Sequence, residues 1–297
     1  MRLPLVLALL STLNSQTDSF VSSAFLPASV LGSYYFASQI ATQPSMLVGN
    51  TLRSIFTATT AQVRGDQDRG SAAVRDVFSG CMVFAPLVCM SIPAVFDSFE
   101  RAAWQGKWSD SRYPVLILSA TLVYPTTLQL VAAPIAGLRN WGLAIRIDTL
   151  RAMSRIMPAI IACAIMAWLG INSEVSGIIL AAAVGGTGAI TSTVALLRLL
   201  AHAGMPKTSI IYELYSTPLA ALLSAIAAAG LAHSTTEPLR IAIGDRPAAA
   251  VECATAAIVY FVLALVLLRF GYTNTLERLI NALPEFIRGR ARALFLL

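Results

Sequence analysis

Long apolar segments alternate with short polar or charged links along most of the chain. The hydrocarbon core of a bilayer is about 30 Å thick, and a helix of about 20 residues spans it. Eight segments reach that length, and each ends at Gly, Pro or charged residues. We therefore predict an all-α, polytopic membrane helix bundle, because in lipid only helices and closed barrels satisfy their backbone polar groups. The eight predicted transmembrane helices lie near residues 3–26, 29–63, 72–96, 113–137, 143–169, 178–200, 210–231 and 248–268.

The two ends of the chain need separate interpretations. The first segment resembles a signal peptide at its start, but its hydrophobicity continues to Leu26, so we expect a spanning helix. After residue 269, apolar residues recur on one side of a predicted helix and are followed by three arginines. A helix of this kind lies on an anionic membrane surface. We therefore predict a transmembrane bundle over residues 1–269 and a cytoplasmic amphipathic tail over residues 270–297.

The second segment carries a stripe of polar residues. They recur at intervals of 3, 4 or 7 positions, so a helix places them on one face. Pro44 should kink this helix near the middle of the membrane. An arginine inside a span is costly unless it faces protein or water, so we place Arg53 on the wall of a cavity. The stripe consists of Gln39, Gln43, Asn50, Arg53, Thr57, Thr60 and Arg64.

This stripe has two interpretations. Ser, Thr, Asn and Gln side chains also hydrogen bond between transmembrane helices without any role in transport. We assign that packing role to the Ser and Thr positions. For Arg53, together with Gln39, Gln43 and Asn50, we favour a cavity.

Charged residues inside the other segments are few. Asp18 is the one acid of the first segment. Asp148, Arg151 and Arg155 follow at i, i+3 and i+7, so one helical face carries an acid and two guanidiniums. This set is either an internally paired ion cluster at the membrane surface or an anion site at the mouth of a cavity. Elsewhere, Glu213 and Glu252 stand near the starts of their spans, and we interpret them as interfacial residues rather than proton carriers.

Composition supports a membrane protein and excludes several other classes. Of the 297 residues, 57% are hydrophobic and 12% are charged, whereas a soluble domain has about 25% charged residues. The net charge of +6 is spread between the apolar runs and forms no basic patch for nucleic acid. The four cysteines lie within apolar runs without CxxC spacing, and the two histidines are isolated. We therefore expect no metal, no cofactor and no nucleic-acid partner.

Loop lengths and glycines argue against an enzyme. The longest predicted loop, residues 97–112, has 16 residues and is too short to hold a catalytic domain. The glycine-rich run at residues 185–188 has neither the preceding strand nor the following Lys of a phosphate loop. We interpret it as a site of close helix packing. The sequence therefore predicts no enzymatic activity.

The distribution of basic residues predicts the orientation. With eight spans, 16 of the 21 Lys and Arg residues fall on the side that carries both termini. Cytoplasmic loops are the ones enriched in Lys and Arg. We therefore expect a multi-pass protein with both termini in the cytoplasm.

A series of short motifs runs along the first 145 residues. They are Asp18 late in an amphipathic span, the run Val30–Ala37, then Pro44, Arg53 and Phe56, the link Asp66–Arg69, the triplet Gly106–Trp108, and the helix end Pro134–Gly137. In these motifs the chain resembles the polysaccharide flippase branch of the multidrug/oligosaccharidyl-lipid/polysaccharide transporter superfamily. From about residue 146, only the helix pattern and the small-residue composition agree. One motif departs from the family, since Ser19 follows Asp18 where a basic residue is frequent.

The resemblance implies half of a two-bundle transporter. Members of the family have twelve or fourteen spans in two pseudo-symmetric bundles, and this chain corresponds to the carboxy-terminal bundle alone. Alternating access between two bundles needs both of them. We therefore expect a missing N-terminal bundle or a second subunit as partner, besides membrane lipids.

By the same resemblance, the substrate would be a polyprenyl-pyrophosphate-linked oligosaccharide crossing the bacterial inner membrane for surface polysaccharide synthesis. Arg53, Arg151 and Arg155 would attract the pyrophosphate, and the amides of the polar stripe would hydrogen bond to sugars. Asp18 would either hold Arg53 in place or couple transport to a cation, with Asp148 as a further ion-pair residue. Two alternatives remain open: a cation-coupled multidrug exporter, which should contain further buried carboxylates, and a non-transporting membrane scaffold or fragment.

Overall fold

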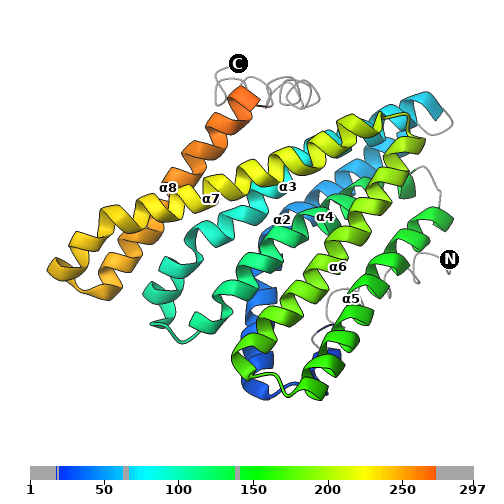
Figure 1. Cartoon of the computed structure of the whole chain (residues 1–297). Coiled ribbons are helices and arrows are strands. Elements are labelled where there is room, and N and C mark those ends of the chain that lie inside the picture. The colour runs from blue at the N-terminus through cyan, green and yellow to red at the C-terminus, as the bar shows by residue number, and fades with distance from the viewer. Residues whose placement is uncertain (1–17, 19, 63–66, 138–140, 272–297) are drawn as a thin grey trace.

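A computed structural model describes residues 18, 20–62, 67–137 and 141–271. All the regular elements within these ranges are helices, which confirms the predicted all-helical architecture. Figure 1 shows them as long, roughly antiparallel rods. In chain order they are α2 (Ala28–Gln62), α3 (Gln67–Trp104), the short 3-10 helix η1 (Ser109–Ser111), α4 (Arg112–Gly137), α5 (Trp141–Leu169), α6 (Ser173–His202), α7 (Lys207–Ile243) and α8 (Asp245–Gly271).

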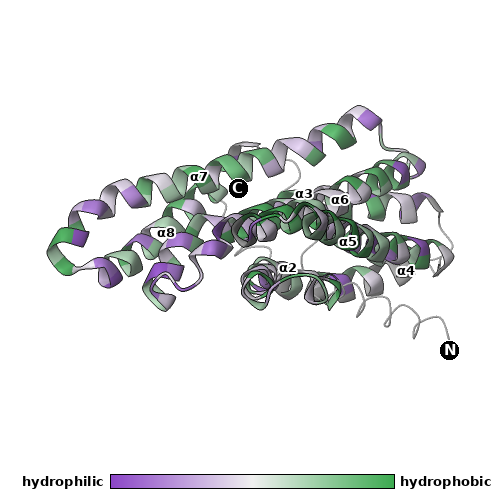
Figure 2. Ribbon diagram, turned by 60° about the horizontal axis from the view of Figure 1, so that its bottom comes forward, coloured by the Kyte–Doolittle hydropathy of each residue, from purple (hydrophilic) through white to green (hydrophobic). Residues whose placement is uncertain are grey.

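Six of these helices, α3 to α8, are long and apolar enough to cross a membrane. Figure 2 shows hydrophobic residues along the middle of the bundle, with hydrophilic residues gathered toward several helix ends. We therefore describe the chain as a helical membrane protein. The first predicted span and the predicted tail fall almost entirely outside the described residues. The total of eight spans stays a prediction.

Two helices continue beyond their predicted ends. α3 runs to Trp104, through half of the segment predicted as a polar loop, and α7 runs to Ile243, past the predicted end at residue 231. The prediction ended both helices where the apolar run ends. The polar residues beyond those points stay helical because several of them find partners on neighbouring helices, as described below. Gly244, with φ of +84°, then makes the tight turn into α8.

The helices form two groups that share α4. α3, α7 and α8 pack on one another, while α4 packs on α2, α3 and α6, and α5 packs on α6. Each group buries its own apolar core. The first core includes Phe78, Leu128 and Leu214, and the second includes Tyr34, Leu118 and Leu180. Since α4 contributes to both cores, it connects the two groups.

The glycine-rich run of α6 sits against α4 at one point. A Cβ atom built on Gly185 would collide with the hydroxyl of Thr121, which already hydrogen bonds to the carbonyl of Ile117. Gly186 and Gly188 face no such neighbour. The predicted close packing through small residues is therefore confirmed at Gly185, where the absence of a side chain lets two helices approach.

Candidate functional site: a charged column between α2, α4 and α5

An ion pair on α5 forms the centre of the candidate site. Arg151 Nη1 lies 3.3 Å from Asp148 Oδ1, one turn away on the same helix, and the two side chains are 16% and 10% exposed. Arg151 Nη2 donates a 3.0 Å hydrogen bond to Gln129 Oε1 on α4. The Arg151 Nε–H group is buried and has no partner within the described part of the chain. The guanidinium is thus held in position while one of its donors stays unused.

Two further guanidiniums lie within electrostatic reach of Arg151. The charges of Arg53 on α2 and of Arg155 on α5 both act on it, and both residues are half-buried. Near Arg53, the Thr57 hydroxyl donates to the Arg53 carbonyl at 2.8 Å and lies 3.4 Å from the Ala133 carbonyl on α4. This contact attaches α2 to α4 beside Arg53, in line with the packing role predicted for the threonines.

Asp18 lies at the other end of the same group of charges. Its Oδ2 atom accepts a 2.9 Å hydrogen bond from the Tyr34 hydroxyl on α2, and both residues are almost completely buried. The charge of Arg155 acts on Tyr34 as well as on Arg151. Arg155 therefore links Asp18 and Tyr34 to the cluster around Arg151. We call this set the charged column: Asp18, Tyr34, Arg53, Gln129, Asp148, Arg151 and Arg155.

The amides of the polar stripe are placed less favourably than the arginines. Gln39 is half-buried and Gln43 is exposed on α2. Among the hydrogen bonds of the described residues, neither amide side chain reaches an arginine of the column. The Asn50 side chain lies outside the described residues. Tyr34 and Gln129, which sequence analysis did not single out, hydrogen bond to Asp18 and Arg151 of the column, and the expected contacts of the stripe amides with sugars stay a prediction.

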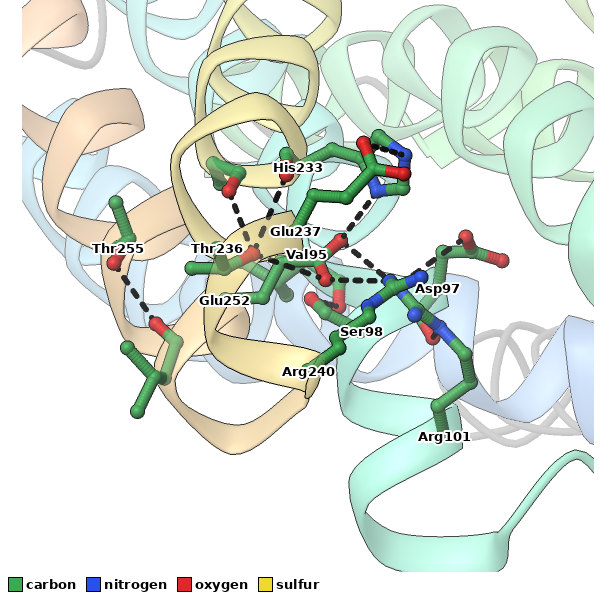
Figure 3. A network of polar contacts seen from close by, with 12 residues as sticks. Val95, Asp97, Ser98, Arg101, His233, Thr236, Glu237, Arg240, Glu252 and Thr255 are labelled. Atoms are coloured by element: carbon green, nitrogen blue, oxygen red, sulfur yellow. Dashed lines mark hydrogen bonds and ion pairs between the residues drawn. The ribbon is translucent and has the colours of Figure 1, made fainter. Parts of the chain in front are cut away.

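A second polar cluster was not predicted at all. Glu252 on α8 is 5% exposed, and its position at the membrane interface stays a prediction. Its carboxylate lies 2.8 Å from Arg101 Nη2 on α3 and 2.9 Å from Arg240 Nη2 on α7 (Figure 3). Glu213 on α7 is half-buried and accepts a 3.0 Å hydrogen bond from the Ser79 hydroxyl on α3. Basic residues in the flanking polar segments were the signal, but sequence alone does not show that they meet.

The charged column has the chemistry of an anion site. Among its described members, three guanidiniums stand against the carboxylates of Asp18 and Asp148. Guanidinium groups bind phosphate and carboxylate through two parallel N–H donors. Like charges held together between helices gain most from a bound anion, because the surrounding dielectric screens them poorly.

Comparison with protein-family models, with curated proteins and with solved structures returned no match.

Proposed function

We propose that this chain is the carboxy-terminal half of a flippase that translocates polyprenyl-pyrophosphate-linked oligosaccharide across the bacterial inner membrane. One observation carries the proposal: Arg151, held between α5 and α4 by Asp148 and Gln129, lies within electrostatic reach of the guanidiniums of Arg53 and Arg155. The motifs of the first 145 residues point to the same substrate class. A pyrophosphate carries several negative oxygens, which match a group of guanidiniums better than a single one.

The physical task of such a protein explains why the arginines would be buried. Moving a pyrophosphate and sugars through hydrocarbon costs several kcal/mol for each polar group that loses its hydrogen bonds. A polar path between helices replaces those bonds. Asp148 and Gln129 orient Arg151 toward this task, and its unused Nε–H is available once the side chain adjusts.

Complementation of surface glycan tests the proposal. Arg53→Ala and Arg151→Ala should each remove most of the glycan at normal protein level, because each takes a guanidinium from the column. Arg53→Lys should keep only part of the activity if the contact is bidentate. Arg146→Ala is the matched control, since Arg146 is an exposed arginine on the same helix as Arg151. Undiminished glycan in Arg53→Ala would refute the proposal.

A cation-coupled exporter is the second candidate, favoured by buried acids that sequence analysis did not expect. Glu100 and Glu252 are buried in addition to Asp18. However, Glu100 accepts the Trp108 N–H at 2.8 Å, and Glu252 is held by two arginines. Drug resistance that disappears in Asp18→Asn while surface glycan persists would favour the exporter over the flippase.

A further inference from the structure

One buried carboxylate joins three helices at one end of the bundle. Glu252 Oε1 on α8 accepts from Arg101 Nη2 on α3 at 2.8 Å, and Glu252 Oε2 accepts from Arg240 Nη2 on α7 at 2.9 Å. Figure 3 shows the two guanidiniums converging on the carboxylate from different helices. His233 Nδ1 lies 3.4 Å from Oε1, and the Thr236 hydroxyl lies 3.4 Å from Oε2. We call Arg101, His233, Thr236, Arg240 and Glu252 the clasp.

The other acids near the clasp are peripheral. Asp97 is half exposed and lies 3.9 Å from Arg101 and 3.6 Å from Arg112. Glu237 has a side chain that is 68% exposed and lies 3.9 Å from His233. Both stand in reach of water, whereas Glu252 does not. The buried ion pairs between the three helices at this point therefore depend on Glu252, while Arg246 Nε on α8 adds an exposed 3.0 Å hydrogen bond to the Ala102 carbonyl on α3.

The clasp lies at one end of the contact between α3 and the hairpin formed by α7 and α8. Along α3, Ser79 bonds to Glu213, the Leu87 carbonyl accepts from the Tyr260 hydroxyl, and Arg101 bonds to Glu252. Ser79 and Arg101 are 22 residues apart in α3, about 33 Å along the helix axis. Of the three contacts, the one between Arg101 and Glu252 joins two full charges. Pro86 and Pro93 lie in α3 between Ser79 and Arg101, and the helix can bend at these prolines.

The clasp is also distant from the Gln129–Arg151 part of the charged column. Asp97, beside the clasp, pairs with Arg112 at the first residue of α4, whereas Arg151 bonds to Gln129 further along the same helix. Arg112 and Gln129 are 17 residues apart, about 26 Å along the axis. The Gln129–Arg151 part of the column is thus distant from the clasp, whereas its Asp18–Tyr34 part lies toward the clasp end of α4, because the Ser111 hydroxyl, next to Arg112, donates to the Ser33 carbonyl at 3.0 Å.

α7 and α8 form a closely packed hairpin. α7 packs on its neighbours through alanines at intervals of 3 or 4 residues, all almost completely buried, and α7 and α8 are extensively in contact. Small residues let helix backbones approach closely and form many van der Waals contacts. The alanines are Ala221, Ala225, Ala228 and Ala232.

We propose that the clasp is a gate: it closes this end of the bundle, and its opening lets the α7–α8 hairpin separate from α3. Glu252 bonds to both partner helices, so the loss of one carboxylate removes both attachments and leaves two guanidiniums that repel each other. The need for a gate rests on the proposed transport function, because a carrier opens its site to each side of the membrane in turn. The ion pairs of the clasp do not depend on the proposed function, because they are present in the chain without substrate.

Distances between spin labels test the gate. The full chain is labelled at Ala103 on α3 and at Ile241 on α7, which are exposed residues beside Arg101 and Arg240, with Cys253 replaced by Ser. Electron-electron distances are measured in nanodiscs without substrate. Glu252→Gln should shift the distribution to longer and broader distances. The matched control is Glu237→Gln, which removes the same charge from a neighbouring site that does not contact α3.

Arg101→Gln tests the gate if Glu252→Gln does not give a single folded species. It removes the α3 attachment and leaves Arg240 paired with Glu252, so it should also lengthen the distance. An unchanged distance in the folded variant would overturn the gate, and so would an equal shift in Glu237→Gln. If the distance lengthens but Arg53→Ala keeps full glycan export, the gate stands and the proposed substrate falls.

Discussion

The charged column and the clasp use the same residue types in opposite ways. At the centre of the clasp is a carboxylate, and two guanidiniums converge on it from different helices. At the centre of the column is a guanidinium, and the charges of two more guanidiniums act on it. The clasp is built around an anion and the column around a cation, although each has one more guanidinium than carboxylate among its described members. Because one carboxylate of the clasp joins three helices, we expect the clasp to restrain the fold. Because the column brings together three guanidiniums, we expect it to bind a ligand with several negative oxygens.

Sequence separation sharpens the contrast. Asp148 and Arg151 are neighbours on one helix, so their pairing orients an arginine without joining helices. Arg101 and Glu252 come from distant parts of the chain, and their pairing joins α3 to α8. We therefore expect substitutions in the clasp to act mainly on stability and conformation, and substitutions in the column to act mainly on ligand binding.

The largest effect should follow the loss of the clasp carboxylate. Glu252→Ala leaves two guanidiniums uncompensated in a buried position and should lower the free energy of unfolding by about 3 kcal/mol or more. Thermal unfolding in detergent measures this. The control Glu237→Ala removes an exposed acid and should cost less than about 0.5 kcal/mol. Equal effects of the two variants would show that Glu252 contributes no more to stability than the exposed Glu237.

Within the column, removing the acid should cost more than removing the base. Asp148→Asn leaves three guanidiniums near one another and should cost about 2 kcal/mol, because the like charges lose their nearest counter-charge. Arg151→Gln relieves part of that repulsion and should cost about 1 kcal/mol or less. The same unfolding measurement ranks the two variants. The reverse order would mean that the column is an ordinary satisfied ion pair.

Binding of an anion should stabilise the column in the intact protein. Inorganic pyrophosphate at ten times its Kd should raise the free energy of unfolding by about 1.4 kcal/mol. Arg53→Gln should abolish that gain, while Glu252→Gln should keep it, since the clasp lies at the other end of α4. A gain lost equally in both variants would place the anion elsewhere.

The smallest effect belongs to the exposed pair beside the clasp. Asp97→Asn removes contacts at 3.6 Å and 3.9 Å between largely exposed side chains, and such pairs contribute about 0.5 kcal/mol or less. The change should shrink further as salt is added. An effect comparable to that of Glu252→Ala would show that Asp97, as well as Glu252, holds the helices together at this end.

Local patterns were sufficient for much of the fold and for part of the site. Apolar runs of membrane length predicted the helices, because a buried backbone must satisfy its own hydrogen bonds. Helical spacing placed Asp148, Arg151 and Arg155 on one face and singled out Arg53. The spacing does not show how the helix faces are arranged around one another. The shared role of Arg53, Arg151 and Arg155 was therefore an expectation of the family resemblance, and only the structure places Arg53 within electrostatic reach of Arg151.

Tertiary structure alone decided which distant residues became partners. Three pairings depend on how the helices pack, which a period of 3.6 residues does not encode. They are Tyr34 with Asp18, Gln129 with Arg151, and Glu252 with two arginines. The same packing extended α3 and α7 through polar residues. What the sequence determined was each helix and its faces. What the packing decided was which charges lie together: two guanidiniums around one carboxylate in the clasp, and three guanidiniums with two carboxylates in the column.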